Sequence, residues 1–237
     1  MKQFAIIGIG SFGKRILEEL MLVDCEILLV DKDSDLIDFY KDQVSAAYIA
    51  DVINEETIKK IIPPDIDTVI IDLGDKIEAS ILVTNYLKKM SIDNIIVKAE
   101  TDQHGEILKI VGADHVVFPN SEAARRITPM LVSDLLFSYM PISNGLVMAE
   151  VRVPQEFIGQ SLIEANIRQN RGINVIAIRK ESGGDFEFFS PDYIMTSEDI
   201  FLVVGAELNV MKFAGADQII RKKSLTDLFK KIFRAKS

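Results

Sequence analysis

Phe4-Ala5-Ile6-Ile7-Gly8-Ile9-Gly10-Ser11-Phe12-Gly13 opens this chain and decides its fold. The apolar run is typical of a buried strand and passes directly into Gly-x-Gly-x-x-Gly, which an amphipathic segment follows to Leu22. In such a turn Gly8 permits the tight bend, Gly10 lets the backbone approach a phosphate, and Gly13 lets helix and strand pack closely. Amides at the new helix N-terminus would then face an anion. The stretch predicts a phosphate-binding strand–turn–helix unit.

A second apolar run, residues 26–30, ends in Asp31 eighteen residues after Gly13, where a ribose-binding acid belongs. Such a carboxylate also repels a 2′-phosphate, which disfavours NADP. The same alternation continues along the first half of the chain. Further strands are expected at 46–50, 68–73, 94–98 and 115–118, with helices at 33–40, 55–61, 77–89 and 102–111. This order predicts an α/β fold with a Rossmann-like doubly wound parallel sheet.

Ligands of such sheets bind outside the carboxyl ends of the strands. Asp51, Gly74 and Lys98 each follow the third, fourth or fifth expected strand. The predicted nucleotide site therefore comprises Gly8, Ile9, Gly10, Ser11, Phe12, Gly13, Asp31, Lys32, Asp51, Val52, Leu73, Gly74 and Lys98.

The pattern changes in the second half. Residues 121–139 keep a helical spacing that Pro129 interrupts, and Pro141, Asn144 and Gly145 indicate a boundary. Strands at 146–153, 173–179 and 199–204, a short helix at 158–165 and a hairpin turn at Gly183-Gly184 predict a small α+β domain. We expect domains at 1–140 and 141–218, followed by a tail at 219–237.

Composition narrows the class of protein. The 237 residues are 48% apolar and 27% charged, as in globular proteins, and no apolar run approaches the ~20 residues of a membrane span. Met1 leads almost directly into the first strand, which leaves no room for a signal peptide, and Cys25 is the single cysteine. His104 and His115 lack metal-ligand spacing, and no nucleophilic triad is recognisable. A cytoplasmic protein without a metal is expected.

Further motifs carry a resemblance. They are Asp72-Leu73-Gly74-Asp75-Lys76-Ile77-Glu78-Ala79-Ser80, Asn94-Ile95-Ile96-Val97-Lys98-Ala99, Gly112-Ala113-Asp114-His115-Val116-Val117-Phe118-Pro119 and residues 167–178, IRQNRGINVIAI. In this order they resemble the RCK (regulator of conductance of potassium) family, the cytosolic gating subunits of bacterial Ktr/Trk-type potassium transporters. The resemblance covers about residues 3–215 and its second part is a C-terminal RCK domain.

The resemblance implies a function without catalysis. The N-terminal domain would bind an adenine nucleotide, NAD/NADH or ATP/ADP, and homodimers would assemble into a ring, an octamer, at the inner face of the membrane beneath a potassium channel subunit. An NAD-dependent oxidoreductase is the alternative. Such an enzyme needs an acid/base residue facing the nicotinamide, and residues 145–215 contain Tyr193 but no histidine.

Two departures concern the choice of nucleotide. At the position of Ser11, ATP-gated members carry an arginine. Directly after the proline that corresponds to Pro119 they carry an acid, where this chain has Asn120. The resemblance therefore implies a nucleotide but only weak ATP/ADP discrimination. In Gram-positive relatives the second domain binds cyclic di-AMP at the dimer interface, and the corresponding residues are Ile163, Arg168, Asn174, Val175 and Pro191. The alternative that these residues have only structural roles, with Val175 in the core of a strand and Arg168 at the surface, stays open.

The end of the chain is basic, although the whole carries a net charge of −9. Residues 221–237 hold seven basic side chains and one acid. Apolar side chains recur there at helical spacing, at Leu225, Leu228, Phe229, Ile232 and Phe233. The tail predicts an amphipathic helix that docks on an anionic membrane or a partner, or else packs on the acidic body or its own copy.

Overall fold

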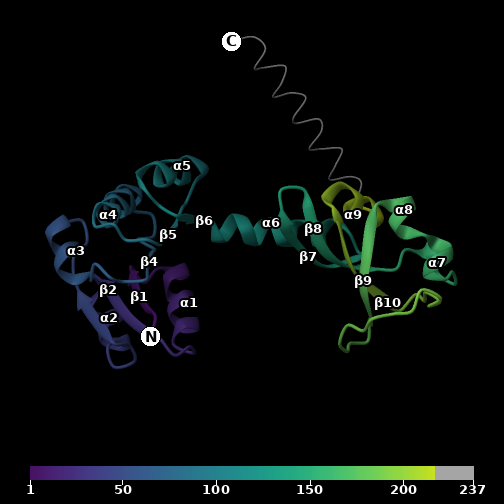
Figure 1. The fold of residues 1–237 in the computed structure, drawn as a ribbon, viewed down its shortest axis with the longest axis horizontal. Coiled ribbons are helices and arrows are strands. Elements are labelled where there is room, and N and C mark those ends of the chain that lie inside the picture. Colours follow the sequence, from purple (N-terminus) through teal and green to yellow (C-terminus); the bar gives the residue numbers. More distant parts are fainter. Residues whose placement is uncertain (217–237) are drawn as a thin grey trace, which may run out of the picture. The chain divides into compact units, whose positions relative to one another are not determined.

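The computed structural model describes residues 1–216 (Figure 1). The chain divides into two compact units between Asn120 and Ser121. The expected boundary at residue 140 thus lies inside the second unit, and the predicted tail at 219–237 lies outside the described residues. Within the described part, no helix is both long and apolar enough to span a bilayer.

Six parallel strands form the sheet of the N-terminal unit in the order β3-β2-β1-β4-β5-β6. They are β1 (Gln3–Ile7), β2 (Glu26–Asp31), β3 (Ala46–Ile49), β4 (Thr68–Ile71), β5 (Ile95–Lys98) and β6 (His115–Val117). The order confirms the doubly wound, Rossmann-like sheet. Because the chain order changes direction between β1 and β4, the crevice for a ligand is expected at their carboxyl ends.

Helices cover both faces of this sheet (Figure 1). They are α1 (Ser11–Leu20) and α2 (Ser34–Tyr40) on one face, and α3 (Glu55–Ile61), α4 (Ile77–Lys89) and α5 (Asp102–Val111) on the other. Successive strand residues point to opposite faces, so Ile6 packs in the cluster with Leu17, whereas Ile7 packs in the cluster with Leu87. This two-sided burial explains why the strands are continuously apolar.

The C-terminal unit contains a four-stranded antiparallel sheet in the order β7-β8-β10-β9. Its strands are β7 (Leu136–Ser143), β8 (Leu146–Arg152), β9 (Ile173–Lys180) and β10 (Asp199–Ala206). Its helices are α6 (Pro119–Val132), which begins just before the division, η1 (Gln155–Phe157), α7 (Leu162–Ala165), α8 (Ile167–Arg171) and α9 (Glu207–Phe213). The small α+β domain is confirmed.

One local prediction for this unit is wrong. The helix expected over 121–139 ends at Val132, because Leu136 pairs with Val151 of β8 and Tyr139 with Ala149. Pairing with β8 therefore overrides the helical spacing. The turn expected at Gly183-Gly184 is present: beyond it Glu187 forms an antiparallel bridge with Ile178 of β9, and the amide of each donates to the carbonyl oxygen of the other at 2.9 Å. The next long strand, β10, begins only at Asp199.

Candidate functional site

The glycine turn has the shape that its sequence predicts. Gly8 has φ +88°, and a Cβ there would lie 2.1 Å from the carbonyl oxygen of Asp72. The Gly8 amide donates to the carbonyl oxygen of Val30 at 2.8 Å, which ties the turn to β2. A Cβ on Gly13 would lie 2.5 Å from the carbonyl oxygen of Gly8. Gly8 therefore permits the bend, and Gly13 permits the close approach of helix and strand.

Asp72 changes the expected role of the helix N-terminus. Its fully buried carboxylate follows β4, and its Oδ2 accepts hydrogen bonds from the amides of Phe12 and Gly13, both at 2.9 Å. A Cβ on Gly10 would lie 2.3 Å from the same oxygen, although the φ of Gly10, −69°, suits any residue. Gly10 thus makes room for the chain's own carboxylate, and the close approach of its backbone to a phosphate stays a prediction.

Lys98 pairs with two carboxylates, one of which is Asp72. Its Nζ is 3.4 Å from Oδ1 of Asp72 and 2.8 Å from Oε1 of Glu100, and its side chain is 10% exposed. Burial alone lowers the pKa of this ammonium, but the two carboxylates outweigh burial and raise the pKa above its ordinary value. Lys98 therefore stays charged, and its single positive charge is shared between Asp72 and Glu100.

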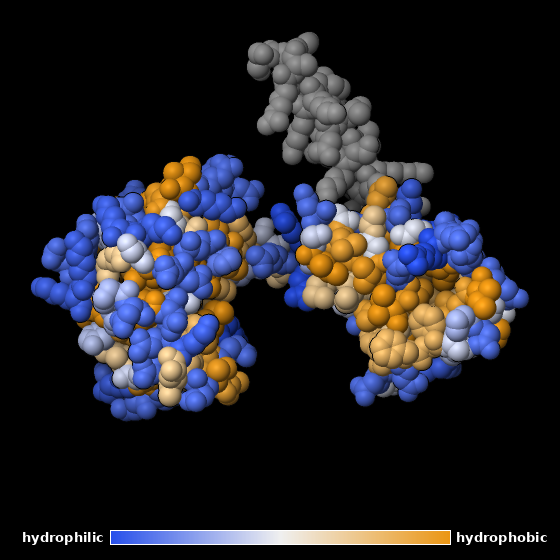
Figure 2. Space-filling view, in the orientation of Figure 1, coloured by the Kyte–Doolittle hydropathy of each residue, from blue (hydrophilic) through white to orange (hydrophobic). Residues whose placement is uncertain are grey.

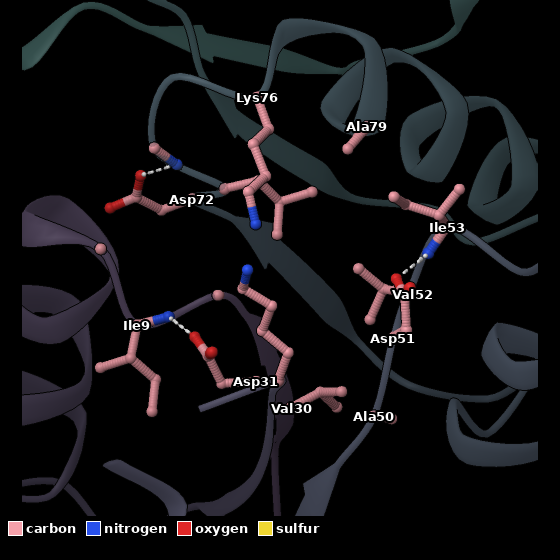
Figure 3. A pocket seen from close by; sticks show the side chains of 15 residues that line it. Ile9, Val30, Asp31, Ala50, Asp51, Val52, Ile53, Asp72, Lys76 and Ala79 are labelled. Carbon is pink, nitrogen blue, oxygen red and sulfur yellow. Dashed lines mark hydrogen bonds between the residues drawn. The ribbon is translucent and has the colours of Figure 1, made fainter. Parts of the chain in front are cut away.

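A pocket of about 230 Å³ opens at the carboxyl ends of β1, β2, β3 and β4 (Figure 3). The predicted residues that line it are Gly8, Ile9, Gly10, Asp31, Lys32, Asp51, Val52, Leu73 and Gly74. The predicted residues Ser11, Phe12, Gly13 and Lys98 are not among its lining residues. The residues that sequence reasoning missed are Val30, Ala50, Ile53, Asp72, Lys76 and Ala79. Most of these flank a predicted residue, whereas Lys76 and Ala79 are brought in by the start of α4.

Asp31 holds the polar end of the pocket together (Figure 3). Its Oδ2 accepts a hydrogen bond from the Ile9 amide at 2.6 Å, and its Oδ1 accepts one from the Asp33 amide at 2.9 Å. Each carboxylate oxygen has a further lone pair, so both can still accept a ribose hydroxyl. The side chain thus both fixes the glycine turn against β2 and remains a candidate acceptor for a sugar.

The other end of the pocket is mostly apolar. Figure 3 places Val52, Ile53 and Asp51 across the pocket from Ile9 and Asp31. The carboxylate of Asp51 accepts a hydrogen bond from the Ile53 amide at 3.1 Å, which closes a local turn. A cavity with hydroxyl acceptors at one end and aliphatic walls at the other suits a nucleoside, whose sugar is polar and whose base has apolar faces.

The residues of the second predicted site lie on several elements of the C-terminal unit. The Ile163 amide donates to the carbonyl oxygen of Pro191 at 3.0 Å, which joins two of these residues. Asn174 and Val175 lie on β9, and Arg168 lies on α8. A cavity of about 350 Å³ on this unit is lined by other residues, around 178–190 and Tyr193. The cyclic di-AMP site therefore stays a prediction.

Hydrophobic side chains gather on one face of the C-terminal unit, over β9 and α7 (Figure 2). Exposed large hydrophobic residues of this unit include Ile163, Ile176, Phe188 and Ile194. Exposed apolar patches of this kind mark interaction or ligand surfaces in many proteins.

Fold and pocket together define a two-domain protein, in which a Rossmann-like domain with a pocket at its strand ends precedes a small antiparallel α+β domain. Residues 4–119 match the TrkA-N domain, and residues 146–215 match the TrkA-C domain. The Ktr system potassium uptake protein C of Bacillus subtilis is 34% identical over 214 residues, which are 90% of this chain and 96% of that protein. The Ktr system potassium uptake protein A of Vibrio alginolyticus is 30% identical over 208 residues, which are 87% of this chain and 93% of that protein. The chain therefore belongs to the family of Ktr system potassium uptake proteins, and the RCK resemblance is confirmed.

Solved structures agree on the fold. The GsuK RCK domain superposes with a TM-score of 0.62 at 16% identity, and it covers 90% of this chain and 48% of that chain. The GsuK channel bound to NAD gives a TM-score of 0.61 at 17% identity. The match covers 91% of this chain and 39% of the channel chain. This chain spans less than half the length of these two structures.

Proposed function

We propose that this protein is the nucleotide-binding regulatory subunit of a potassium uptake system. The main support for this proposal is the pocket at the carboxyl ends of β1 and β4, where the glycine turn lies against Asp31, in a chain homologous to Ktr potassium uptake proteins. The subunit acts in the cytoplasm, at the inner face of the membrane, on a membrane-embedded potassium channel subunit. A ligand that binds two conformations of the subunit unequally shifts their populations and so changes the channel.

The ligand is an adenine nucleotide, NAD/NADH or ATP/ADP. Asp31 accepts the ribose hydroxyls, and the aliphatic walls at Val52 and Ile53 contact the base. The structure of a related fold, the GsuK channel, is of a form bound to NAD. Ser11 supplies no charge for a terminal phosphate, so we expect ATP and ADP to differ by less than tenfold in affinity, about 1.4 kcal/mol.

Regulation is favoured over catalysis by the surroundings of Tyr193. Its hydroxyl donates to Oδ1 of the buried Asp199 at 3.0 Å, and Lys180 Nζ donates to the same carboxylate at 2.6 Å. These groups satisfy one another inside the C-terminal unit, so the tyrosine is engaged structurally rather than free for proton transfer. An NAD-dependent oxidoreductase would need another acid/base residue.

The subunit works as homodimers that assemble into a ring, with eight copies the expected number. The C-terminal unit binds cyclic di-AMP through Ile163, Arg168, Asn174, Val175 and Pro191. Arginine pairs with phosphate in two parallel hydrogen bonds, and the amide of Asn174 can recognise an adenine edge. The basic tail, which would touch anionic membrane, lies outside the described residues. Native mass spectrometry of the full chain tests the assembly, and a monomer at micromolar concentration would contradict it.

Reconstitution with a Ktr-type membrane subunit in liposomes tests the regulatory role. Potassium flux should depend on which of ATP, ADP, NAD or NADH is present, and Asp31→Ala should remove that dependence. Flux that is the same with every nucleotide, together with turnover of NADH by the isolated chain, would favour the oxidoreductase instead.

Calorimetry with cyclic di-AMP tests the second ligand. Arg168→Ala should weaken binding strongly and leave nucleotide binding in the first domain unchanged. Arg171 is the matched control, since it lies on the same helix and pairs with Glu156 at 2.7 Å. If the unmodified chain does not bind cyclic di-AMP at micromolar concentration, the C-terminal unit is better described as a dimerisation domain.

A further inference from the structure

Two lysines line the nucleotide pocket. Lys32 directly follows Asp31 at the end of β2, and Lys76 immediately precedes α4. They are far apart in the chain, but β2 and β4 both neighbour β1, which brings their carboxyl ends to one pocket. Figure 3 shows the ammonium end of Lys76 reaching into the pocket, between the polar end at Asp31 and the apolar end at Val52.

The two lysines share the lining of one pocket, and neither ammonium has a carboxylate partner in the part of the chain that the structure describes. Among residues 1–216 neither Lys32 nor Lys76 makes an ion pair within 4.0 Å, whereas Lys98 makes two. The neighbouring Lys32 ammonium is the largest cause that lowers the pKa of Lys76, and burial lowers it further against the fields of Asp31 and Asp51. Two like charges held together in this way would be stabilised by an anion between them.

At the usual position of that anion, a carboxylate of the chain already accepts two of the helix amides. In a glycine-turn domain the phosphates of a nucleotide lie on the amides at the helix N-terminus. Here the Asp72 carboxylate accepts the Phe12 and Gly13 amides at 2.9 Å, and its other oxygen accepts the Gly74 amide at 3.3 Å. A phosphate placed on those amides would meet a buried negative charge, so its binding there is opposed.

We propose that Lys32 and Lys76 form the phosphate-binding subsite of this pocket, in place of the N-terminus of α1. The proposal rests on the proposed function, in which the pocket binds an adenine nucleotide. Each ammonium offers three donors and fits the oxygens of a phosphate ester. The ester can be the 5′-phosphate of the nucleotide or a 2′-phosphate on its ribose. In the second case Lys32 and Lys76 offset the repulsion from Asp31.

Calorimetry on the full chain tests this subsite, with adenosine, AMP, ADP, NAD and NADP as titrants at one salt concentration. We expect Lys32→Gln with Lys76→Gln to weaken binding of the phosphorylated ligands by on the order of tenfold to a hundredfold. Adenosine affinity should stay unchanged, since Asp31 and the apolar walls are intact. Lys60→Gln is the matched control, because Lys60 is an exposed lysine of the same domain outside the pocket.

The ligands distinguish the two sources of phosphate. A loss for AMP and ADP places the 5′-phosphate on the lysines, and a loss for NADP that exceeds the loss for NAD places the 2′-phosphate there. Unchanged nucleotide affinity in the double variant, or an equal loss for adenosine and AMP, would overturn the subsite while the nucleotide-binding function stands. An unmodified chain that binds none of the five ligands would contradict both.

Discussion

Asp72→Ala is the change that the structure predicts to be most damaging around the glycine turn. The carboxylate accepts three amide hydrogen bonds, from Phe12 and Gly13 at 2.9 Å and from Gly74 at 3.3 Å. It also pairs with Lys98 at 3.4 Å, and its side chain is fully buried. The substitution therefore removes one partner of a buried ion pair and the acceptor for the first turn of α1.

Removal of one member of a buried ion pair costs about 3–5 kcal/mol. Lys98 keeps Glu100 at 2.8 Å, so we expect the lower end of this range, about 3 kcal/mol. Asp72→Asn retains an oxygen acceptor for the amides but loses the charge, and should cost roughly half as much. A helix N-terminus left without acceptors adds to the loss, because its amides have no partners within the helix.

Hydrogen exchange is the suitable assay, because a two-domain chain need not unfold in one step. Peptides that contain α1 should exchange on the order of a hundredfold faster in Asp72→Ala, which corresponds to about 3 kcal/mol. Asp75→Ala is the control, since Asp75 is an exposed acid of the same loop. A destabilisation of α1 below about 1 kcal/mol would refute the reasoning, because it would mean that water or another group replaces the carboxylate.

Three further predictions follow from the same geometry. Asp31→Ala should lower nucleotide affinity by on the order of tenfold to a hundredfold in calorimetry, and unchanged affinity for every adenine nucleotide would refute its role. His104 is 3% exposed, and burial lowers its pKa from 6.5, so the unfolded state takes up the proton first. The free energy of unfolding should therefore fall as the pH drops below about 6.5 towards the folded pKa, and His104→Gln should lack this contribution to the pH dependence. Urea titrations at several pH values measure it, and the same pH dependence in both proteins would contradict the prediction. Gly10→Ala should lower the free energy of unfolding, because the added Cβ meets the Asp72 carboxylate, and it should lower it less in an Asp72→Ala background. If the losses of the two substitutions simply add in the double variant, this contact is contradicted.

The N-terminal fold could be predicted because its signals are local. Each strand is buried on both faces, so apolar runs such as residues 68–71 stand out against amphipathic helices. The secondary structure of the C-terminal unit could be predicted less well. Leu136 and Tyr139 have a helical spacing, yet they pair with β8, and the hydroxyl of Tyr139 donates to Glu207 at 3.0 Å. Partners distant in the chain decided that segment, and a local pattern does not contain them.

The sequence by itself determined the class of site. Gly8 and Asp31 could be recognised because a glycine turn and an acid after the second strand occupy set positions in one βαβ unit. Only the tertiary structure decided what occupies the turn. Asp72 reaches Phe12 and Gly13 across sixty residues of chain because β4 pairs with β1. The same pairing brings Lys76 to the pocket, and a contact of this kind depends on which strands are neighbours, which local spacing does not specify.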